Sequence, residues 1–395
     1  MSCVRPHNRR PSLALVTGVA IGLVSAAGLM GFEVSVASDQ PDSARAQIPD
    51  LYRLPVAEWP APEVDEGVAW KELSPRPEPP SAPDEAVIAL GQWLFFDPRL
   101  SGSGQVACAS CHDPQLGWAD GRRVPFGHQR FPGIRNAPTV LDMAFQDVFF
   151  WDGRADSLEA QAIEAILNPE EMNHTAEGVR AALSGDQALR AEFESALGDP
   201  EPTLAAVAEA LAAFQRSLVS PRGRFDRFLA GDHDALTDAE IRGLHWFRTQ
   251  ARCMNCHHGA MLSDGEFHNL GLSFYGRRLE DLGRYDITGE PEDVGRFRTP
   301  TLRSAAMTAP YMHMGLMPTL RHVVIFYNAG GGRARPRGDQ HDDPLFPSTS
   351  PLLQPLGLDA EQQAELVAFL ETLSGRLQRP RRQLDIEDRL RLIAD

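Results

Sequence analysis

The sequence contains very little cysteine, five residues among 395, and this scarcity limits the chemistry that thiols could provide. Four of the cysteines form two pairs of identical spacing, Cys108 with Cys111 and Cys253 with Cys256, and the fifth is Cys3 near the N-terminus. Outside these pairs no two thiols remain, which excludes a disulfide framework and a separate four-cysteine zinc site. The two pairs therefore need a common explanation.

Positive charge is also scarce. The chain has 38 lysines and arginines against 54 aspartates and glutamates, which gives a formal net charge of −16. This balance argues against nucleic acid or an anionic membrane surface as a partner, and it suits a basic protein attracted by electrostatic steering. Runs with the alternating pattern of β-strands are rare as well, so we expect a mainly α-helical fold.

Each cysteine pair is followed directly by a histidine, in "CASCH" (108–112) and "CMNCH" (253–257). Cys-x-x-Cys-His is the spacing of a c-type haem attachment site. The two thiols reach the two vinyl groups of the haem, and the adjacent imidazole, His112 or His257, ligates its iron. A chance match or half of a zinc site is the alternative, but two copies that use nearly all the thiols favour two covalently bound haems.

The N-terminus has the features of an export signal. Arg5, Arg9 and Arg10 form a basic head, an apolar stretch runs from 13 to 32, and Ser35-Val36-Ala37 offers a small-x-small cleavage site. We predict a signal peptide over residues 1–37, with an uncleaved membrane anchor as the alternative because about 20 apolar residues can span a bilayer. Both interpretations place the rest of the chain in the periplasm, where covalent haem attachment is expected.

Beyond this signal the pattern predicts four further segments. Residues 38–84 form a proline-rich N-terminal extension, which we expect to be a plain linker. Helical start and stop signals then recur along the chain, including Thr203 as an N-cap and a capping box of Thr237 with Glu240. These signals predict helices over residues 84–96, 156–168, 202–218, 237–247, 318–331 and 359–375. We predict a first haem domain over 85–225, a second over 226–375, and a C-terminal tail over 376–395.

The residue on the far side of each iron decides the chemistry, because axial ligands and the polarity of the distal pocket set potential and access. After the first motif the candidates include His128 and His174. After the second motif the candidates are more numerous: Met261, Met307, Met312, Met314, Met317, Tyr311 and Tyr327. Spacing alone does not choose among them.

Several longer motifs make the sequence resemble the bacterial dihaem cytochrome c peroxidase family, nearer the branch of the enzyme that matures methylamine dehydrogenase. The match runs from about Ala89 to Gly375, and its motifs stand in family order: "ALGQWLFFDPRLSGSGQVACASCHDPQLGWADG", "RNAPTVLDMAF", "FFWDGRADSLEAQA", "NPEEM", "FRTPTLR" and "TAPYMHMG". The resemblance implies two cytochrome c-like domains. It implies a peroxide-binding haem in the N-terminal domain, a six-coordinate haem in the C-terminal domain, and calcium at the domain interface.

The resemblance also implies roles for residues around the first haem. His128, in "FGHQRFPG", matches the displaceable distal ligand of the peroxide-binding iron. Gln161 and Glu171 match the polar pair beside the peroxide, where a carboxylate can move a proton between the two oxygens. Trp151, in "FFWDGR", matches the tryptophan that lies between the haems. Without the resemblance, each of these residues could equally be a helix-end acid, a solvated side chain or a core aromatic.

The remaining implied roles concern calcium and the second haem. Asn136, in "RNAPT", matches a side-chain ligand of calcium, and the carbonyls of Thr308 and Pro310 match its other protein ligands, which suits a cation that prefers oxygen. Tyr327, in "LRHVVIFYNAGG", falls where the peroxidases place a methionine ligand and the maturation enzyme a tyrosine. The sequence "His-Met-Gly" at 313–315 departs from the usual His-Asp-Gly, and it leaves Met314 or Met317 as an alternative ligand.

Together these features predict a periplasmic dihaem c enzyme that activates hydrogen peroxide and oxidises a partner protein or another external donor. The first alternative is a plain cytochrome c peroxidase that draws electrons from a small c-type cytochrome or copper protein. It would use Met314 or Met317 on the second haem, and His128 would leave the first iron before peroxide binds. The second alternative is a dihaem electron carrier, which needs neither Glu171 nor Gln161.

Overall fold

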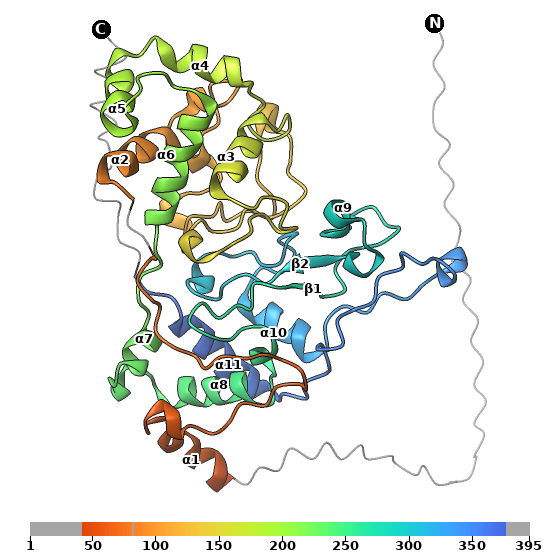
Figure 1. Ribbon diagram of the computed structural model, residues 1–395. Coiled ribbons are helices and arrows are strands. Elements are labelled where there is room, and N and C mark those ends of the chain that lie inside the picture. The colour runs from red at the N-terminus through yellow and green to blue at the C-terminus, as the bar shows by residue number, and fades with distance from the viewer. Residues whose placement is uncertain (1–41, 81–82, 377–395) are drawn as a thin grey trace, which may run out of the picture. The chain divides into compact units, whose positions relative to one another are not determined.

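The computed structural model describes residues 42–80 and 83–376 (Figure 1). The expected signal peptide (1–37) lies outside the described residues, as does the predicted tail apart from its first residue, Arg376. Within the described part of the chain, no helix has the length and apolar character needed to cross a bilayer.

The first hydrophobic core is built from helices between residues 85 and 217. They are α2 (Glu85–Phe95), α3 (Leu158–Leu167), α4 (Ala176–Ser184), α5 (Gln187–Leu197) and α6 (Leu204–Ser217). Each begins at a side-chain N-cap, which satisfies one of the free N–H groups of the first turn; the caps are Asp84, Ser157, Thr175, Asp186 and Thr203. Helix α6 packs against α2 and α3, and α5 packs against α2.

The second hydrophobic core uses a similar helix pair. Its helices are α7 (Arg224–Leu229), α8 (Asp238–Arg248), α10 (Leu320–Asn328) and α11 (Ala360–Thr372). The capping box predicted for Thr237 and Glu240 is confirmed at the start of α8. Helix α11 packs against α8 and α10. Figure 1 shows the α2–α6 group and this second group as separate clusters of helices.

A glycine allows the closest helix contact in each core. A Cβ atom at Gly91 of α2 would lie 1.9 Å from the carbonyl oxygen of Ala210 in α6, and one at Gly243 of α8 would lie 2.0 Å from the carbonyl oxygen of Glu365 in α11. Both distances are far below van der Waals contact, so any larger residue would force the two helices apart. The two cores therefore share the same local solution for packing one pair of helices closely, α2 with α6 and α8 with α11.

The proline-rich extension is not a plain linker, and this expectation was wrong. Residues 42–52 form helix α1 (Asp42–Tyr52), which packs against α8. Four apolar side chains of the extension are buried in the second core: Ile48, Tyr52, Trp59 and Leu73. Proline prevents regular structure over most of this segment, but it does not prevent spaced apolar residues from packing. The extension is thus an integral part of the second core.

Strands are short and few in the described residues, as the sequence indicates. β1 (Phe267–Asn269) and β2 (Arg296–Arg298) form an antiparallel pair in which Phe267 lies opposite Arg298. The short helix α9 (Tyr285–Thr288) lies in the loop between them. In Figure 1 this pair lies between the two groups of helices. The chain itself passes from the first core to the second between Leu218 and Phe225.

Candidate functional site around the two Cys-x-x-Cys-His motifs

The first motif opens onto a large cavity. Cys108, Cys111 and His112 line it, and its volume is about 430 Å³, within the usual range for ligand pockets. Three further residues singled out from the sequence line the same cavity: Trp151, Gln161 and Glu171. The fold therefore brings together a haem-attachment motif and the residues expected to act on peroxide.

The two motif histidines are held in the same way. The Nδ1 atom of His112 lies 3.2 Å from the carbonyl oxygen of Trp118, and Nδ1 of His257 lies 2.8 Å from the carbonyl oxygen of Leu262. A histidine that donates from Nδ1 to a carbonyl presents Nε2 as its metal-binding nitrogen. Burial lowers the pKa of both imidazoles, which keeps them neutral and able to bind iron.

The two carbonyl acceptors lie on strained backbone. Trp118 has φ of 59° and Leu262 has φ of 48°, in the left-handed region that bulky residues rarely adopt. A residue in this conformation costs on the order of 1–3 kcal/mol, and the surrounding structure must supply that energy. Because the same strain occurs behind both motif histidines, it indicates that the carbonyl direction is functionally constrained at each.

The motif thiols are free and half-buried. None of the four cysteines forms a disulfide. Burial raises the pKa of Cys108, Cys111 and Cys253 to about 12, and it raises the pKa of Cys256 as well. These are therefore not thiolates poised for nucleophilic catalysis or zinc binding, which need a lowered pKa. Uncharged, half-buried thiols beside a neutral imidazole fit thioether attachment of a haem.

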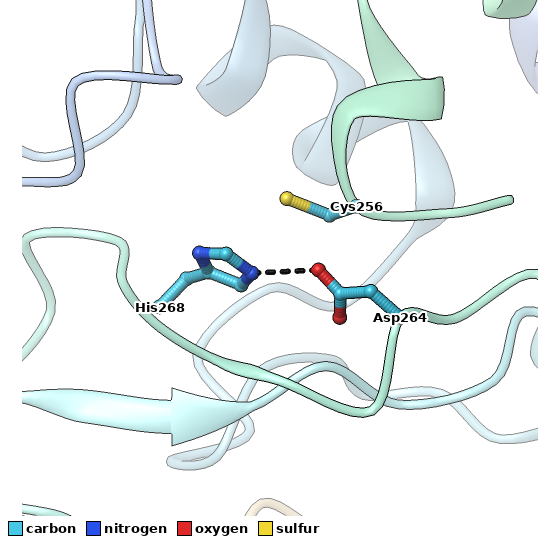
Figure 2. Close-up of side chains that lie close together, drawn as sticks. All are labelled: Cys256, Asp264 and His268. Carbon is cyan, nitrogen blue, oxygen red and sulfur yellow. Dashed lines mark hydrogen bonds and ion pairs between the residues drawn. The ribbon is translucent and has the colours of Figure 1, made fainter. Parts of the chain in front are cut away.

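A cluster beside the second motif was not anticipated from the sequence. Figure 2 shows Cys256, Asp264 and His268, whose ligand atoms all lie within 4.8 Å of one another. His268 Nε2 lies 2.8 Å from a carboxylate oxygen of Asp264. A cation at this position would need the Cys256 sulfur as a thiolate, whereas haem attachment converts it to a thioether. The two uses exclude each other, and the motif favours the haem.

Among the groups that line the first cavity, the carboxyl group of Glu171 has the pKa best suited to proton transfer. Burial raises the pKa of Glu171 to about 7, and the nearby positive charge of Arg154 offsets only part of this effect. A carboxyl group with a pKa near neutrality can both accept and release a proton under physiological conditions. Gln161, on α3, supplies an uncharged amide to the same cavity.

His128 lies next to the cavity on a strained loop. Gly127 lines the cavity, and the His128 N–H donates to the carbonyl oxygen of Glu171 at 2.7 Å. Gln129 and Arg130 have φ of 51° and 64°. Nδ1 of His128 is buried without a hydrogen-bond partner among the described residues. The other histidine candidate, His174, accepts a hydrogen bond from the Thr175 N–H at 3.0 Å and forms part of the cap of α4.

Trp151 and Asn136 meet at a junction between the two cores. Nε1 of Trp151 donates to the carbonyl oxygen of Asn136 at 2.9 Å, and the Asn136 N–H donates to the carbonyl oxygen of His313 at 2.6 Å. The Asn136 side chain donates from Nδ2 to the carbonyl oxygen of Arg122 at 2.8 Å. Its amide oxygen is therefore the atom that it could offer to a cation. Thr308 and Pro310 lie in the same chain segment as His313.

Tyr327 is the second-haem candidate that the fold brings to the second motif. It lies on α10. Burial raises the pKa of Tyr327 well above the usual value, and the charges of the Cys256 and Cys253 thiolates raise it further. Such charges act on the phenol only when the two cysteines lie close to it. Met314 is buried too, but its carbonyl oxygen faces the Arg123 guanidinium at 3.5 Å. Met317 pairs with Tyr311 through the backbone, and the Tyr311 hydroxyl donates to the carbonyl oxygen of Ala305 at 3.1 Å.

Comparison with known proteins identifies the family. The profile of the family described as "Di-haem cytochrome c peroxidase" matches residues 85–234. Methylamine utilization protein MauG of Methylorubrum extorquens is 41% identical over 308 residues, 77% of this chain and 82% of that protein. The chain belongs to the di-haem cytochrome c peroxidase family.

Other members of the family are similar over most of their length. Cytochrome-c peroxidase IdrP1 of Pseudomonas sp. strain SCT is 36% identical over 332 residues, 76% of this chain and 84% of that protein. The crystal structure of the diheme peroxidase BthA from Burkholderia thailandensis matches with a TM-score of 0.64 and 28% identity, covering 83% of this chain and 99% of BthA. The predicted family and mainly helical fold are confirmed, and the chain is a peroxidase-type oxidoreductase that uses haem and peroxide.

One residue of this di-haem peroxidase was missed in the sequence analysis although it lies within a quoted motif. Arg298, in "FRTP", lines the first cavity but belongs to β2, almost 190 residues after the first motif. Nothing in its local sequence distinguishes it from Arg296, two residues earlier on the same strand. Only the packing of β2 against the segment around Trp151 places one of these arginines in the cavity.

Proposed function

We propose that each Cys-x-x-Cys-His motif holds one covalent haem, and that the enzyme activates hydrogen peroxide at the first haem to oxidise a partner protein or another external donor. The observation that supports this most directly is the Glu171 carboxyl group, whose pKa burial raises to about 7 in the cavity lined by Cys108, Cys111 and His112. When bound, the haem supplies the iron at which the peroxide O–O bond is cleaved.

The protein residues then divide the remaining work. His112 would hold the iron, with its ring direction set by the Trp118 carbonyl. Glu171, as the carboxylate, accepts the proton from one peroxide oxygen and delivers it to the other, which leaves as water. The Gln161 amide orients the peroxide by hydrogen bonding. Proton transfer of this kind contributes roughly 10²- to 10⁴-fold to a rate.

At the second motif, we propose that His257 and Tyr327 would hold the second iron. A tyrosine oxygen is a hard, anionic ligand that stabilises oxidised iron, whereas a methionine thioether favours the reduced state. Trp151, which lines the first cavity, would carry electrons between the two haems. We further propose that calcium binds at the junction through the Asn136 side chain and the carbonyls of Thr308 and Pro310, which are oxygen donors.

We also propose export to the periplasm and a basic protein as the partner. The basic head and apolar stretch of residues 1–37 support export, and the net charge of −16 supports electrostatic attraction of a basic partner. One observation favours a second candidate, a plain cytochrome c peroxidase. The strained loop of His128, with its unpartnered Nδ1, is suited to a ligand that binds the first iron and leaves it before peroxide enters.

A single experiment tests the proposed function. The purified protein is mixed with peroxide, once alone with its spectrum recorded and once with a reduced donor cytochrome whose oxidation is followed. A spectral change in both haems of the oxidised protein, without prior reduction, supports the leading proposal. Turnover that requires prior reduction and a cytochrome donor supports the plain peroxidase. Failure of peroxide to react in both assays contradicts both candidates.

A further inference from the structure

The first cavity contains one positive charge that no carboxylate balances. Three arginines line it: Arg135, Arg154 and Arg298. Arg135 is ion-paired with Asp152 and, at 2.7 Å, with Asp281. Arg154 is ion-paired with Asp152 at 3.0 Å and also with Glu164.

Arg298 forms no ion pair with any described residue. Its guanidinium reaches only the carbonyl oxygens of Phe150 and Thr299, each at 3.5 Å. These distances are at the outer limit of a hydrogen bond, and the side chain as a whole is only 9% exposed.

A buried guanidinium without a counter-ion is costly, because desolvation of a charge is repaid only by a partner of opposite charge. Burial lowers the pKa of Arg298 to about 10, with no acidic group close enough to oppose the shift. The group is still a cation at neutral pH. The cavity therefore has a fixed positive charge on its wall that an anionic ligand would stabilise.

The position of Arg298 indicates which anion would bind to it in the cavity. Its neighbours are Phe150 and Trp151, and its own N–H donates to the Trp151 carbonyl oxygen at 2.8 Å. Arg298 lines the cavity together with the motif residues Cys108 and Cys111, but it comes from a distant segment of the chain, β2. In a haem, the two carboxylate-bearing propionates lie on the edge opposite the vinyl groups that the thiols would bind.

We propose that Arg298 binds a propionate of the first haem through charge-assisted hydrogen bonds. This inference rests on the proposed function, because it requires a haem attached at Cys108 and Cys111. A planar guanidinium matches a carboxylate with two parallel hydrogen bonds. Arg298 lies on β2. Its neighbour on this strand, Phe297, stacks on the ring of His313, with ring centroids 3.6 Å apart.

The contact of Arg298 with a propionate would link the two cores through a short series of hydrogen bonds. β2 pairs with β1, next to the second motif, while Arg298 reaches the first cavity and its N–H holds the carbonyl of Trp151. A positive charge beside a propionate also stabilises the reduced haem relative to the oxidised one. Arg298 is therefore a positioning residue that raises the reduction potential of the first haem and orients Trp151.

The test uses the full holoprotein with both haems attached. Arg298→Gln removes the charge and keeps a polar, though shorter, side chain that can still donate a hydrogen bond. We expect the reduction potential of the first haem, measured by spectroelectrochemistry, to shift downward while that of the second haem is unchanged. Arg296→Gln on the same strand is the matched control, since Arg296 is 40% exposed and pairs with Asp293 at 3.3 Å outside the cavity. This control should shift neither potential.

Two further measurements keep the test decisive. Arg298→Lys retains the charge but not the planar fork, so resonance Raman should show a shifted propionate bending band even if Arg298→Gln fails to fold. An unchanged propionate band in Arg298→Lys, or an unchanged first potential in Arg298→Gln, overturns the proposal. So does an altered affinity for small external anions with the potential unchanged, because that would make Arg298 an anion-binding group for substrate. Absence of a haem at Cys108 and Cys111 by mass would instead overturn the proposed function itself.

Discussion

The surroundings of the two Cys-x-x-Cys-His motifs are alike on one side and different on the other. Behind both motif histidines, a carbonyl on left-handed backbone accepts from Nδ1, at Trp118 in one case and at Leu262 in the other. In front of them, the first motif faces a cavity with a carboxyl and an amide, whereas the second faces the phenol of Tyr327. The proposed attachment of a haem is thus the shared feature, and the opposite side would determine what each iron does.

The two distal groups also respond differently to attachment of the cofactor. The raised pKa of Glu171 is mainly an effect of burial, and a haem in the cavity would preserve that burial. The raised pKa of Tyr327 comes from burial and from two thiolate charges. Thioether bonds abolish these charges and iron brings a positive one, so we expect the phenol to lose its proton once the second haem is bound.

The largest effect should come from removing one attachment site at a time. The unmodified chain should keep two haems after acid-acetone extraction, because thioether bonds survive that treatment. The double variants Cys108→Ser/Cys111→Ser and Cys253→Ser/Cys256→Ser should each keep one haem by mass, and only the first should lose the reaction with peroxide. A mass increase of a single haem in the unmodified chain would contradict the interpretation of both motifs.

Next in size should be the effect of Tyr327→Phe, which removes one oxygen and keeps the ring. We expect the second haem to stay attached but to change its spectrum, and the peroxide-induced change shared by both haems to disappear. Near-infrared absorption and electron paramagnetic resonance measure the ligand directly.

Met314→Leu and Met317→Leu are the matched controls for Tyr327, and they should leave both spectra unchanged. A thioether–iron band in the near infrared of the unmodified protein, lost in either methionine variant, would show that a methionine binds the second iron in place of Tyr327. The plain cytochrome c peroxidase would then be the better proposal.

A smaller effect is expected for Glu171→Gln, which keeps the shape of the side chain but cannot carry a proton. Peroxide turnover should fall by roughly 10²- to 10⁴-fold while both haem spectra are retained. Glu177→Gln is a suitable control, because Glu177 is an exposed carboxylate on the neighbouring helix α4. Near-normal turnover in Glu171→Gln would assign the proton transfer to another group.

The smallest effect should be the pH dependence of the unmodified enzyme. Glu171 must be deprotonated to accept the peroxide proton, and its pKa is raised to about 7. Below that value the carboxylate is progressively protonated, so the rate should fall by about tenfold for each further pH unit. The decline should vanish in Glu171→Gln. A rate that stays constant between pH 7 and pH 5 in the unmodified enzyme would separate Glu171 from the rate-limiting step.

Much of the fold follows from local signals. The side-chain caps at Ser157, Thr203 and Thr237 mark helix starts that depend on three or four consecutive residues. Helices α4 and α5 were not predicted, although Thr175 and Asp186 cap them. Their amphipathic patterns are short and were not distinguished from the surrounding loop. The extension was misjudged for a different reason: Tyr52 and Trp59 are buried only because α8 lies beneath them.

What the sequence determined by itself is the proposed chemistry of haem attachment, because Cys-x-x-Cys-His places two thiols and an imidazole within one turn and needs no distant residue. Only the tertiary structure decided which residues lie on the side of each site opposite the motif histidine. Glu171 meets His112 from about 60 residues away, and Arg298 reaches the same cavity from a strand beside the second motif. Arg296 and Arg298 are chemically identical, yet one is paired near the surface and the other is buried without a counter-ion. That difference depends on which end of β2 packs against Trp151, and long-range packing alone determines it.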